Sequence, residues 1–308
     1  MTEIPTLFEL REAEVRITPY VERTPVRTIQ LADGRQLWLK CENRQHTGAF
    51  KFRGACNAIF SLPEEERRRG VATHSSGNHA AALACAAQLA GVTAHIVMPK
   101  TTTSVKKENV QRYSPTITFC ESTLIAREET LQQVISETGA VEIHPYNDPL
   151  IIAGQGTATL EFLEQIPNLD ILLTPVGGGG LLSGTAIAAK ETNSRMNVIG
   201  TEPAGADDAF RSLRKGKIVP SINPQTICDG LLTSLGTLTF TVIQRYVDDI
   251  VTVSDKAITN AMRFVRKQTG MIIEPSAAVP IAAVLNNKLS TDGKKVGIIL
   301  SGGNVDQI

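Results

Sequence analysis

"GVATHSSGNHAAALACAAQLAGVTAHIVMP", residues 70–99, contains one complete unit of strand, turn, helix and strand. Its first strand is the apolar segment 71–74, and a turn of small polar residues follows. Residues 79–90 are rich in alanine and predict a helix, which Gly91 suits as a C-terminal cap because glycine accepts a left-handed backbone. Residues 92–99 form the next strand. A helix between two consecutive strands is typical of a parallel sheet, so the stretch predicts an α/β fold.

The same alternation of apolar strands and helices recurs along the rest of the chain. It returns in residues 103–145, where the last strand is expected over 140–145, and again in 170–203. This favours open, twisted, mostly parallel sheets with flanking helices. No linker rich in proline, glycine or serine divides the chain, so a second lobe is expected to be inserted rather than appended. We expect a large domain of residues 1–65 and 148–308 and a small α/β domain inserted at 66–147.

Length, charge and cysteine content limit the class of protein. The chain has 308 residues, 42% of them hydrophobic, with 31 basic and 31 acidic residues and no net charge. A neutral chain is a poor match for nucleic acid or an anionic membrane surface. We see no signal peptide and no apolar run of the roughly 18 residues that would span a bilayer. The five scattered cysteines form no CxxC pair, which argues against a zinc cluster or disulfide framework and indicates a reducing cytoplasm.

Lys51 lies between Phe50 and Phe52 in "GAFKFRGACNAI", residues 48–59. Lysine is almost never fully buried without a partner. In one interpretation its stem lies along apolar surface while the ammonium reaches water. In the other, the amine is kept dry and acts as a nucleophile. The stretch alone favours the first interpretation, and the remaining motifs favour the second.

A loop of four consecutive glycines, "VGGGGLLSG" at 176–184, follows an apolar strand and opens a helix. Such a loop lets the backbone approach a ligand and offers several N–H groups to an anion, which the helix N-terminus also favours. It is neither a Walker A loop nor a G-x-G-x-x-G dinucleotide motif. The sequence therefore predicts a cup for a single phosphate, and the alternative is a merely flexible turn.

Two further polar turns, "SSGNHA" at 75–80 and "LSGGN" at 300–304, also follow strands. Ligands of open α/β sheets bind at the carboxyl ends of strands, so both turns are candidates for ligand contacts. The alternatives are plain helix capping for the first and a local serine turn for the second.

An acidic loop, "TEPAGADDAF" at 201–210, places Glu202, Asp207 and Asp208 close together. Oxygen ligands at this density suit a hard divalent cation. The alternative is a solvated acidic surface.

Five blocks in order, "GAFKFRGA", "SSGNHA", "VGGGGLLSG", "EPSAAV" and "LSGGN", resemble the fold-type II pyridoxal-phosphate enzymes, whose fold is that of the tryptophan synthase β subunit. The similarity is greatest to the serine racemase and serine/threonine dehydratase group, with 3-hydroxyaspartate ammonia-lyases as close relatives. It extends over nearly the whole chain. The resemblance implies pyridoxal 5'-phosphate in the cleft between the lobes, a small amino acid as substrate, and a homodimer.

The resemblance also implies a role for each residue around the cofactor. Lys51 would form a covalent imine with the cofactor, and Phe50 would pack beside its ring. Asn78 would bind the ring hydroxyl and Ser301 the pyridine nitrogen. The phosphate would be held by the backbone N–H groups of Gly177, Gly178, Gly179, Gly180 and Leu181.

The implied reaction is the loss of water from a β-hydroxy amino acid such as serine or threonine, which leaves a keto acid and ammonia. Lys51 would remove the Cα proton from one face. Ser76, where dedicated threonine dehydratases usually have alanine, would serve the opposite face and permit serine racemisation. A serine at the pyridine nitrogen makes a weaker electron sink than a carboxylate would, which favours prompt departure of the β-hydroxyl.

The role of Arg127 leaves the identity of the substrate undecided. Arg127 is either an exposed helix arginine paired with a nearby glutamate, or an arginine that binds a substrate carboxylate through two of its N–H groups. In the second case the chain would be a 3-hydroxyaspartate ammonia-lyase that forms oxaloacetate. Ser234 is a candidate for the substrate α-carboxylate. The expected substrate contacts are Ser75, Ser76, Gly77, His79, Arg127 and Ser234.

The resemblance further implies a magnesium, manganese or calcium ion bound by Glu202, the carbonyl of Ala206, and Asp208. His46 stands where animal racemases have a lysine that helps to bind nucleotide, so we expect no ATP activation.

Two alternative functions would predict other features than these. A regulator that binds nucleotides or metabolites in the same cup would not need Lys51. A β-replacement synthase that makes cysteine would usually carry "TSGNTG" in place of "SSGNHA".

Overall fold

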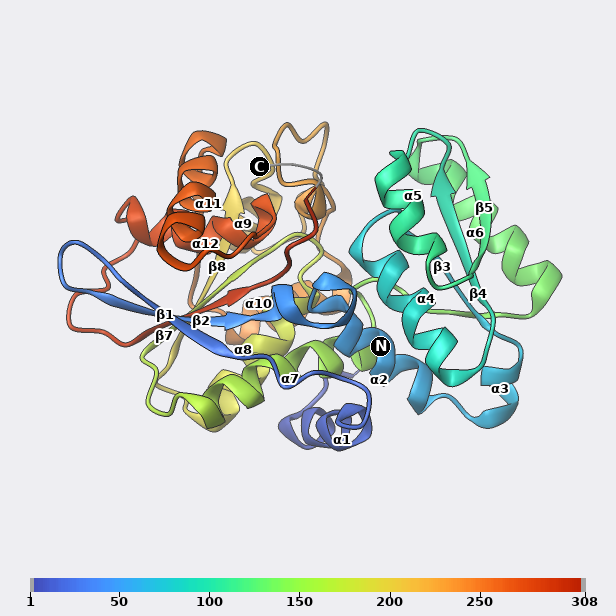
Figure 1. Cartoon of the computed structure of the whole chain (residues 1–308), viewed down its shortest axis with the longest axis horizontal. Helices are drawn as coiled ribbons and strands as arrows, with labels where there is room; N and C mark the ends of the chain where they lie inside the picture. The colour runs from blue at the N-terminus through green and yellow to red at the C-terminus, as the bar shows by residue number, and fades with distance from the viewer. Residues whose placement is uncertain (1–2, 306–308) are drawn as a thin grey trace.

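The computed structural model describes residues 3–305 and consists of two lobes, each with its own sheet (Figure 1). Helices cover the sheets, and all but one pair of neighbouring strands run parallel, so the predicted α/β class with mostly parallel sheets is confirmed. Within residues 3–305 no helix is both long and apolar enough to cross a membrane.

The larger sheet has six strands in the order β1-β2-β10-β7-β8-β9, with β1 antiparallel to β2. Alternate residues of a strand point to opposite faces. In β10, Ile298 and Leu300 pack against one core while Ile299 packs against another, so both faces of the sheet are buried. The strands are β1 (Val26–Gln30), β2 (Gln36–Cys41), β7 (Ile171–Pro175), β8 (Asn197–Pro203), β9 (Asp249–Val253) and β10 (Val296–Leu300).

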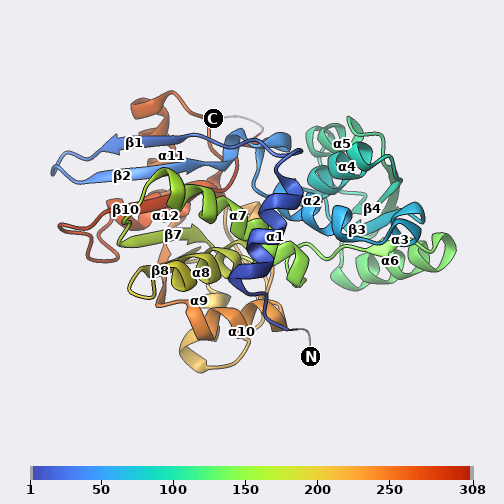
Figure 2. The ribbon, with the colours of Figure 1, turned by 90° about the horizontal axis from the view of Figure 1, so that it is seen from below.

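Helices lie on both faces of this sheet, as Figure 2 shows from below. One face packs against α11 and α12, and the other against α7, α8 and α10. The helices of this lobe are α1 (Leu7–Ile17), α7 (Pro149–Gln165), α8 (Gly180–Thr192), α9 (Asp208–Lys215), α10 (Thr237–Tyr246), α11 (Asp255–Thr269) and α12 (Pro275–Leu285). Three short 3-10 helices are η1 (Glu42–Arg44), η2 (His46–Gly48) and η3 (Asp229–Leu231).

The smaller sheet is fully parallel, in the order β5-β4-β3-β6. Its strands are β3 (Val71–His74), β4 (Ala94–Pro99), β5 (Thr116–Cys120) and β6 (Val141–Glu142), and its helices are α3 (Glu64–Arg68), α4 (Asn78–Ala90), α5 (Ser104–Gln111) and α6 (Leu124–Thr138). The strand expected over 140–145 is only two residues long. It ends early because the ring of His144 accepts the backbone N–H groups of Tyr146 and Asn147 and turns the chain.

Helix α2 (Lys51–Ser61) stands between the two lobes (Figure 1). Phe52 and Ile59 belong to the same core as α4 and β4 of the small lobe. On another side, Gly54 lies so close to α7 that a Cβ on Gly154 would come within 2.6 Å of its Cα. Because α2 serves both lobes, the domain boundary at 65/66 stays a prediction.

A buried cluster of four charged side chains holds α2 to the large lobe. The Arg53 guanidinium donates to Glu42 at 2.7 Å and to Glu161 at 2.8 Å, and Glu161 also accepts from Lys40 at 2.7 Å. Arg53, Lys40 and Glu42 have no exposed surface. Two positive and two negative charges therefore compensate one another away from water.

Arg53→Met should strongly destabilise the protein, since it leaves buried carboxylates without their partner. The expected loss in the free energy of unfolding is about 3–5 kcal/mol, measured by urea denaturation monitored by circular dichroism. The matched control is Arg68→Met, because Arg68 pairs with Glu64 on the surface and exposed pairs contribute little. Equal losses in both variants would contradict a special role for the buried cluster.

Candidate active site

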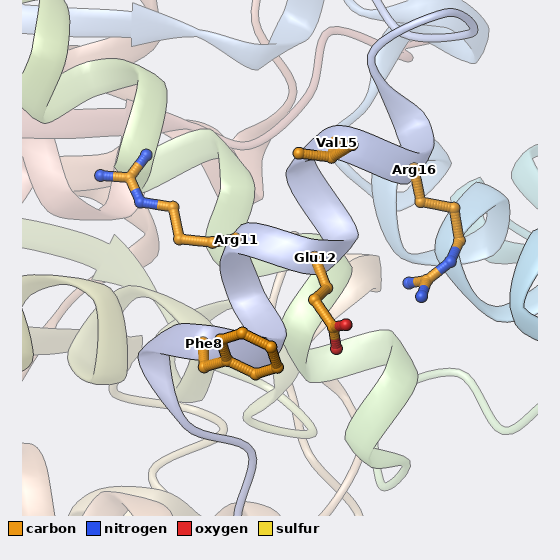
Figure 3. A pocket seen from close by; sticks show the side chains of 5 residues that line it. All are labelled: Phe8, Arg11, Glu12, Val15 and Arg16. Atoms are coloured by element: carbon orange, nitrogen blue, oxygen red, sulfur yellow. The ribbon is translucent and has the colours of Figure 1, made fainter.

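A cavity of about 970 Å³ lies between the lobes, where the turns after β3, β7 and β10 meet. Its size suits a small cofactor together with a small substrate. The structure brings every predicted cofactor and substrate residue to its wall, namely Phe50, Lys51, Ser75, Ser76, Gly77, Asn78, His79, Arg127, Gly177, Gly178, Gly179, Gly180, Leu181, Ser234 and Ser301. A second, shallower hollow of about 450 Å³ on the outer side of α1 is lined by Phe8, Arg11, Glu12, Val15 and Arg16 (Figure 3) and contains none of these residues.

Lys51 is the first residue of α2, and its amine lies at the cavity wall. Nζ donates to the carbonyl oxygen of Pro145 at 2.7 Å and lies 5.3 Å from the centre of the Phe50 ring. Burial lowers the pKa of Lys51 to about 8, although the Glu274 carboxyl opposes this shift. Near physiological pH a lysine with this pKa has a far larger neutral fraction than an ordinary lysine, although most of it is still protonated. The structure therefore favours a desolvated nucleophile over a solvated ammonium.

The glycine loop after β7 is a rigid cup rather than a flexible turn. Gly179 has a φ of 91°, and a Cβ there would lie 2.8 Å from Thr239. A Cβ on Gly178 would overlap the ring of Tyr146. Only glycine fits these positions, and the loop ends in the N-terminus of α8 at the cavity wall. The cup thus combines closely packed backbone with a helix N-terminus, as an anion site requires.

The turn after β3 does not serve to cap a helix. Helix α4 has Gly77 as its N-cap and no side-chain capping bond, so Ser75 and Ser76 are not used in that way. Ser75 Oγ makes one weak contact, with the N–H of Gly77 at 3.4 Å. Both serines line the cavity and are available to a ligand.

The buried His79 ring also follows this turn. Its Nε2 lies 3.2 Å from the carbonyl oxygen of Ile143, and Nδ1 has no partner among the described residues. Burial holds the pKa of His79 well below its usual value, so the ring is neutral. It can support the cavity wall or exchange a hydrogen bond, but not supply a fixed positive charge.

Ser301 has a buried hydroxyl without a hydrogen-bond partner among the described residues. The residue is 2% exposed and lines the cavity. The predicted alternative, a local serine turn, would have given Oγ a backbone partner. An unpaired buried hydroxyl is costly, so this atom fits a polar group of a bound molecule, such as a ring nitrogen.

Arg127 and Ser234 reach the cavity from opposite lobes. Arg127, on α6, takes part in none of the ion pairs found within residues 3–305, contrary to the interpretation of a surface arginine paired with glutamate. Ser234 Oγ accepts the backbone N–H of Ser221 at 2.8 Å. Its hydroxyl hydrogen remains available to a ligand.

Two carboxyls of the acidic loop are buried, so a solvated surface does not describe Glu202 and Asp208. Glu202 accepts the N–H groups of Ala209 and Phe210, and burial raises its pKa well above the usual range. Neither carboxyl oxygen of Asp208 has a hydrogen-bond partner among the described residues, and burial raises the pKa of Asp208 to about 6. Within residues 3–305, no three His, Cys, Asp or Glu side chains form a metal-binding group, so a cation would need backbone and water oxygens as well.

Among the cavity groups that sequence reasoning missed, two make polar contacts with predicted site residues. One is the carbonyl of Pro145, which receives the Lys51 amine, and a backbone atom carries no residue-type signal. The other is Glu274, 5% exposed, which accepts the side-chain N–H groups of Asn78 at 3.0 and 3.2 Å. The signal for Glu274 was an acidic residue in the otherwise apolar "EPSAAV", to which no role had been given.

A lysine of lowered pKa, a glycine cup suited to an anion and a hydroxyl with no partner among the described residues thus meet at the strand ends of a two-lobed α/β fold, the groups that an enzyme using pyridoxal phosphate requires. The chain belongs to the family of pyridoxal-phosphate-dependent enzymes, whose family model matches residues 17–302. This confirms the predicted fold-type II resemblance and cofactor.

Individual relatives match over nearly their full length. The chain is 49% identical to a serine racemase of Dictyostelium discoideum, over 98% of this chain and 95% of that protein. It is 46% identical to a beta-hydroxyaspartate dehydratase of Paracoccus denitrificans, over 98% of this chain and 97% of that protein. The solved structure of maize serine racemase superimposes with a TM-score of 0.95 at 45% identity, covering 99% of this chain and 95% of that one.

Proposed function

We propose that this enzyme dehydrates and deaminates a small β-hydroxy amino acid, such as L-serine or L-threonine, to a keto acid and ammonia, and that it also racemises serine. The observation that carries the proposal is the lysine of lowered pKa, Lys51, in the same cavity as Ser76. A regulator without catalysis would have no use for such an amine. The "SSGNHA" turn argues against a cysteine synthase.

The residues of the cavity fit the cofactor at each of its polar groups. The cup of Gly177, Gly178, Gly179, Gly180 and Leu181 suits the phosphate, Ser301 the ring nitrogen, and Asn78 the ring hydroxyl. Phe50 would pack beside the ring, and Lys51 would supply the amine that the aldehyde requires. When bound, pyridoxal phosphate supplies an electron sink for the electron pair left at Cα.

Two side chains of the cavity would move protons. Lys51 takes the Cα proton on its own face, and its pKa of about 8 lets it both accept and return a proton near neutral pH. Ser76 would act at the opposite face. One group alone permits abstraction and elimination, whereas two groups on two faces permit inversion of Cα. Ser75, Gly77, His79 and Ser234 are proposed to bind the substrate around these atoms.

Ser76→Ala should separate the two reactions. We expect serine racemisation to fall at least about 100-fold, the lower range for loss of a general acid–base, while pyruvate release from L-serine stays within about tenfold of the wild type. Chiral chromatography measures the first and keto-acid release the second.

Lys51→Ala is the companion variant. It should lose both reactions and yield no lysine–cofactor adduct by mass spectrometry after borohydride reduction. Equal loss of both reactions in Ser76→Ala would overturn the two-face assignment. Full turnover in Lys51→Ala would overturn the function itself.

A second candidate function is the dehydration of 3-hydroxyaspartate to oxaloacetate and ammonia. Arg127 lies at the cavity wall, and its Nε donates to the carbonyl of Thr123 at 3.4 Å. It forms none of the ion pairs found within residues 3–305, which favours this function, since a guanidinium suits the second carboxylate of this substrate. The Paracoccus relative is named for beta-hydroxyaspartate.

Arg127→Met should discriminate between the substrates. Loss of one charge-assisted pair predicts a rise of about 10- to 100-fold in KM for 3-hydroxyaspartate and little change for L-serine. The matched control is Arg112→Met, because Arg112, directly after α5, also lines the cavity. A similar rise for both substrates in Arg127→Met would show that this arginine does not select a second carboxylate.

We also propose a divalent cation, magnesium, manganese or calcium, held by Glu202, Asp208 and the carbonyl of Ala206, with water completing its shell. The unpaired buried oxygens of Asp208 support this site, since a cation would compensate them. The ion would stabilise the loop after β8 without touching the substrate.

Adding magnesium should raise the melting temperature of the EDTA-treated protein, because a ligand at 100 times its Kd stabilises the folded state by about 2.7 kcal/mol. Asp208→Asn should abolish the response. Asp207→Asn, whose parent side chain pairs with Arg211 in the same loop, should keep it. An EDTA-insensitive melting temperature in the wild type would exclude the site.

The assembly and location of the protein remain predictions. We propose a homodimer from the resemblance, and a cytoplasmic location that accords with five free, buried cysteines. His46 in place of the nucleotide-binding lysine supports the proposal that ATP does not activate the enzyme.

A further inference from the structure

Asn78, the first residue of α4, forms hydrogen bonds with two side chains of the opposite lobe, Glu274 and Asn304. Its Nδ2 donates to both carboxyl oxygens of Glu274, at 3.0 and 3.2 Å. Its Oδ1 accepts from Asn304 Nδ2 at 2.8 Å, and the same nitrogen donates to the carbonyl of Thr47 at 2.7 Å. Each end of the Asn78 amide therefore has its own partner.

Glu274 is itself held in place by backbone. Its N–H donates to the carbonyl of Gly302 at 3.1 Å, and a Cβ on Gly302 would lie 2.6 Å from its carboxyl oxygen. The residue is the N-cap of α12, and its side chain lines the cavity. Of the three carboxyls at the cavity wall, those of Glu128 and Asp229 belong to exposed residues, so Glu274 is the buried one.

The chemistry of these partners sets the direction of the amide. An ionised carboxylate only accepts hydrogen bonds, so the group of Asn78 that faces it must be the NH2. Nδ2 lies within reach of both oxygens of Glu274, and a single N–H shared between them would leave the second hydrogen for the cavity. Asn304 already occupies Oδ1 with a donor. The amide therefore presents a donor, and not an acceptor, to a bound molecule.

We propose that Glu274 is a positioning residue, which fixes the Asn78 amide so that the site selects the cofactor's ring hydroxyl as a deprotonated oxygen acceptor. The inference rests on the proposed function, because it takes Asn78 as the partner of that hydroxyl. It adds the residue that decides which hydrogen-bonding group Asn78 offers.

The test compares the binding of two molecules to the apoprotein, pyridoxal 5'-phosphate and 3-deoxypyridoxal 5'-phosphate, which lacks the ring hydroxyl. Kd values are measured by absorbance titration at pH 8.5, since burial raises the pKa of Glu274 to about 7 and the carboxyl is then ionised. The readout is the Kd of 3-deoxypyridoxal 5'-phosphate divided by the Kd of pyridoxal 5'-phosphate. The ring hydroxyl also affects binding through its influence on the cofactor itself. That influence is the same in every variant, so comparing the ratio between variants removes it.

Glu274→Ala and Glu274→Met, which respectively empty and fill the space, should each reduce the ratio about tenfold, as should Asn78→Ala. The double variant Asn78→Ala/Glu274→Met should reduce it no further than Asn78→Ala alone, because both residues act through one hydrogen bond. Glu274→Gln keeps an acceptor oxygen and should retain the ratio within about threefold. The control Glu128→Gln, another carboxyl at the cavity wall, should leave it unchanged.

Two results would overturn the proposal. One is an unchanged ratio in both Glu274→Ala and Glu274→Met, as expected if Glu274 only stabilises the fold and both ligands weaken together. The other is an additive loss in the double variant. Failure of wild-type apoprotein to bind pyridoxal phosphate through Lys51 would instead refute the proposed function, so the two failures are distinguishable.

Discussion

The position of the active-site lysine depends on a charge cluster that never meets water. Arg53 bridges Glu42 and Glu161, and thereby binds the first turn of α2 to η1, directly after β2, and to α7. Residues two apart on a helix are rotated by about 200° around its axis, so they point to nearly opposite sides. Arg53 therefore turns into the large lobe while Lys51, two residues earlier, turns toward the cavity. Because an unpaired buried charge is expensive, this arrangement has few alternatives.

The same helix also explains why a cavity exists at this place. The close approach of Gly54 and Gly154 draws α2 onto α7, while Phe52 and Ile59 belong to the core of the small lobe. Helix α2 thus packs against both lobes, at the place where the strand ends of the two sheets face the cavity. Turns from both lobes converge on Lys51, and polar groups that neither lobe could satisfy alone, such as the hydroxyl of Ser301, are left for a ligand.

This geometry also decides what the sequence could predict. Parallel strands bring their carboxyl ends to one edge, so the glycine loop after β7 and Ser301 after β10 could be expected at the same edge of one sheet. The "SSGN" turn belongs to the other sheet, and only the family resemblance placed it beside them. The length of β6 could not be predicted, since it depends on the ring of His144 accepting two backbone N–H groups. Nor could the carbonyl of Pro145 or the role of Glu274, whose partner Asn78 lies 196 positions away. Local patterns gave the scaffold, and long-range polar contacts completed the site.

The distribution of charge in the cavity bears on the choice of reaction. With the cofactor oriented as proposed, the buried carboxyl of Glu274 would lie near the ring hydroxyl and the neutral Ser301 would lie at the ring nitrogen. A serine cannot hold a proton on that nitrogen as a carboxylate would, so the ring draws electrons from Cα less strongly. Negative charge at Cα is then best relieved by expelling a β-substituent. A site built in this way would favour elimination. Racemisation would require a second proton donor that acts before the hydroxyl departs, which is the role proposed for the hydroxyl of Ser76.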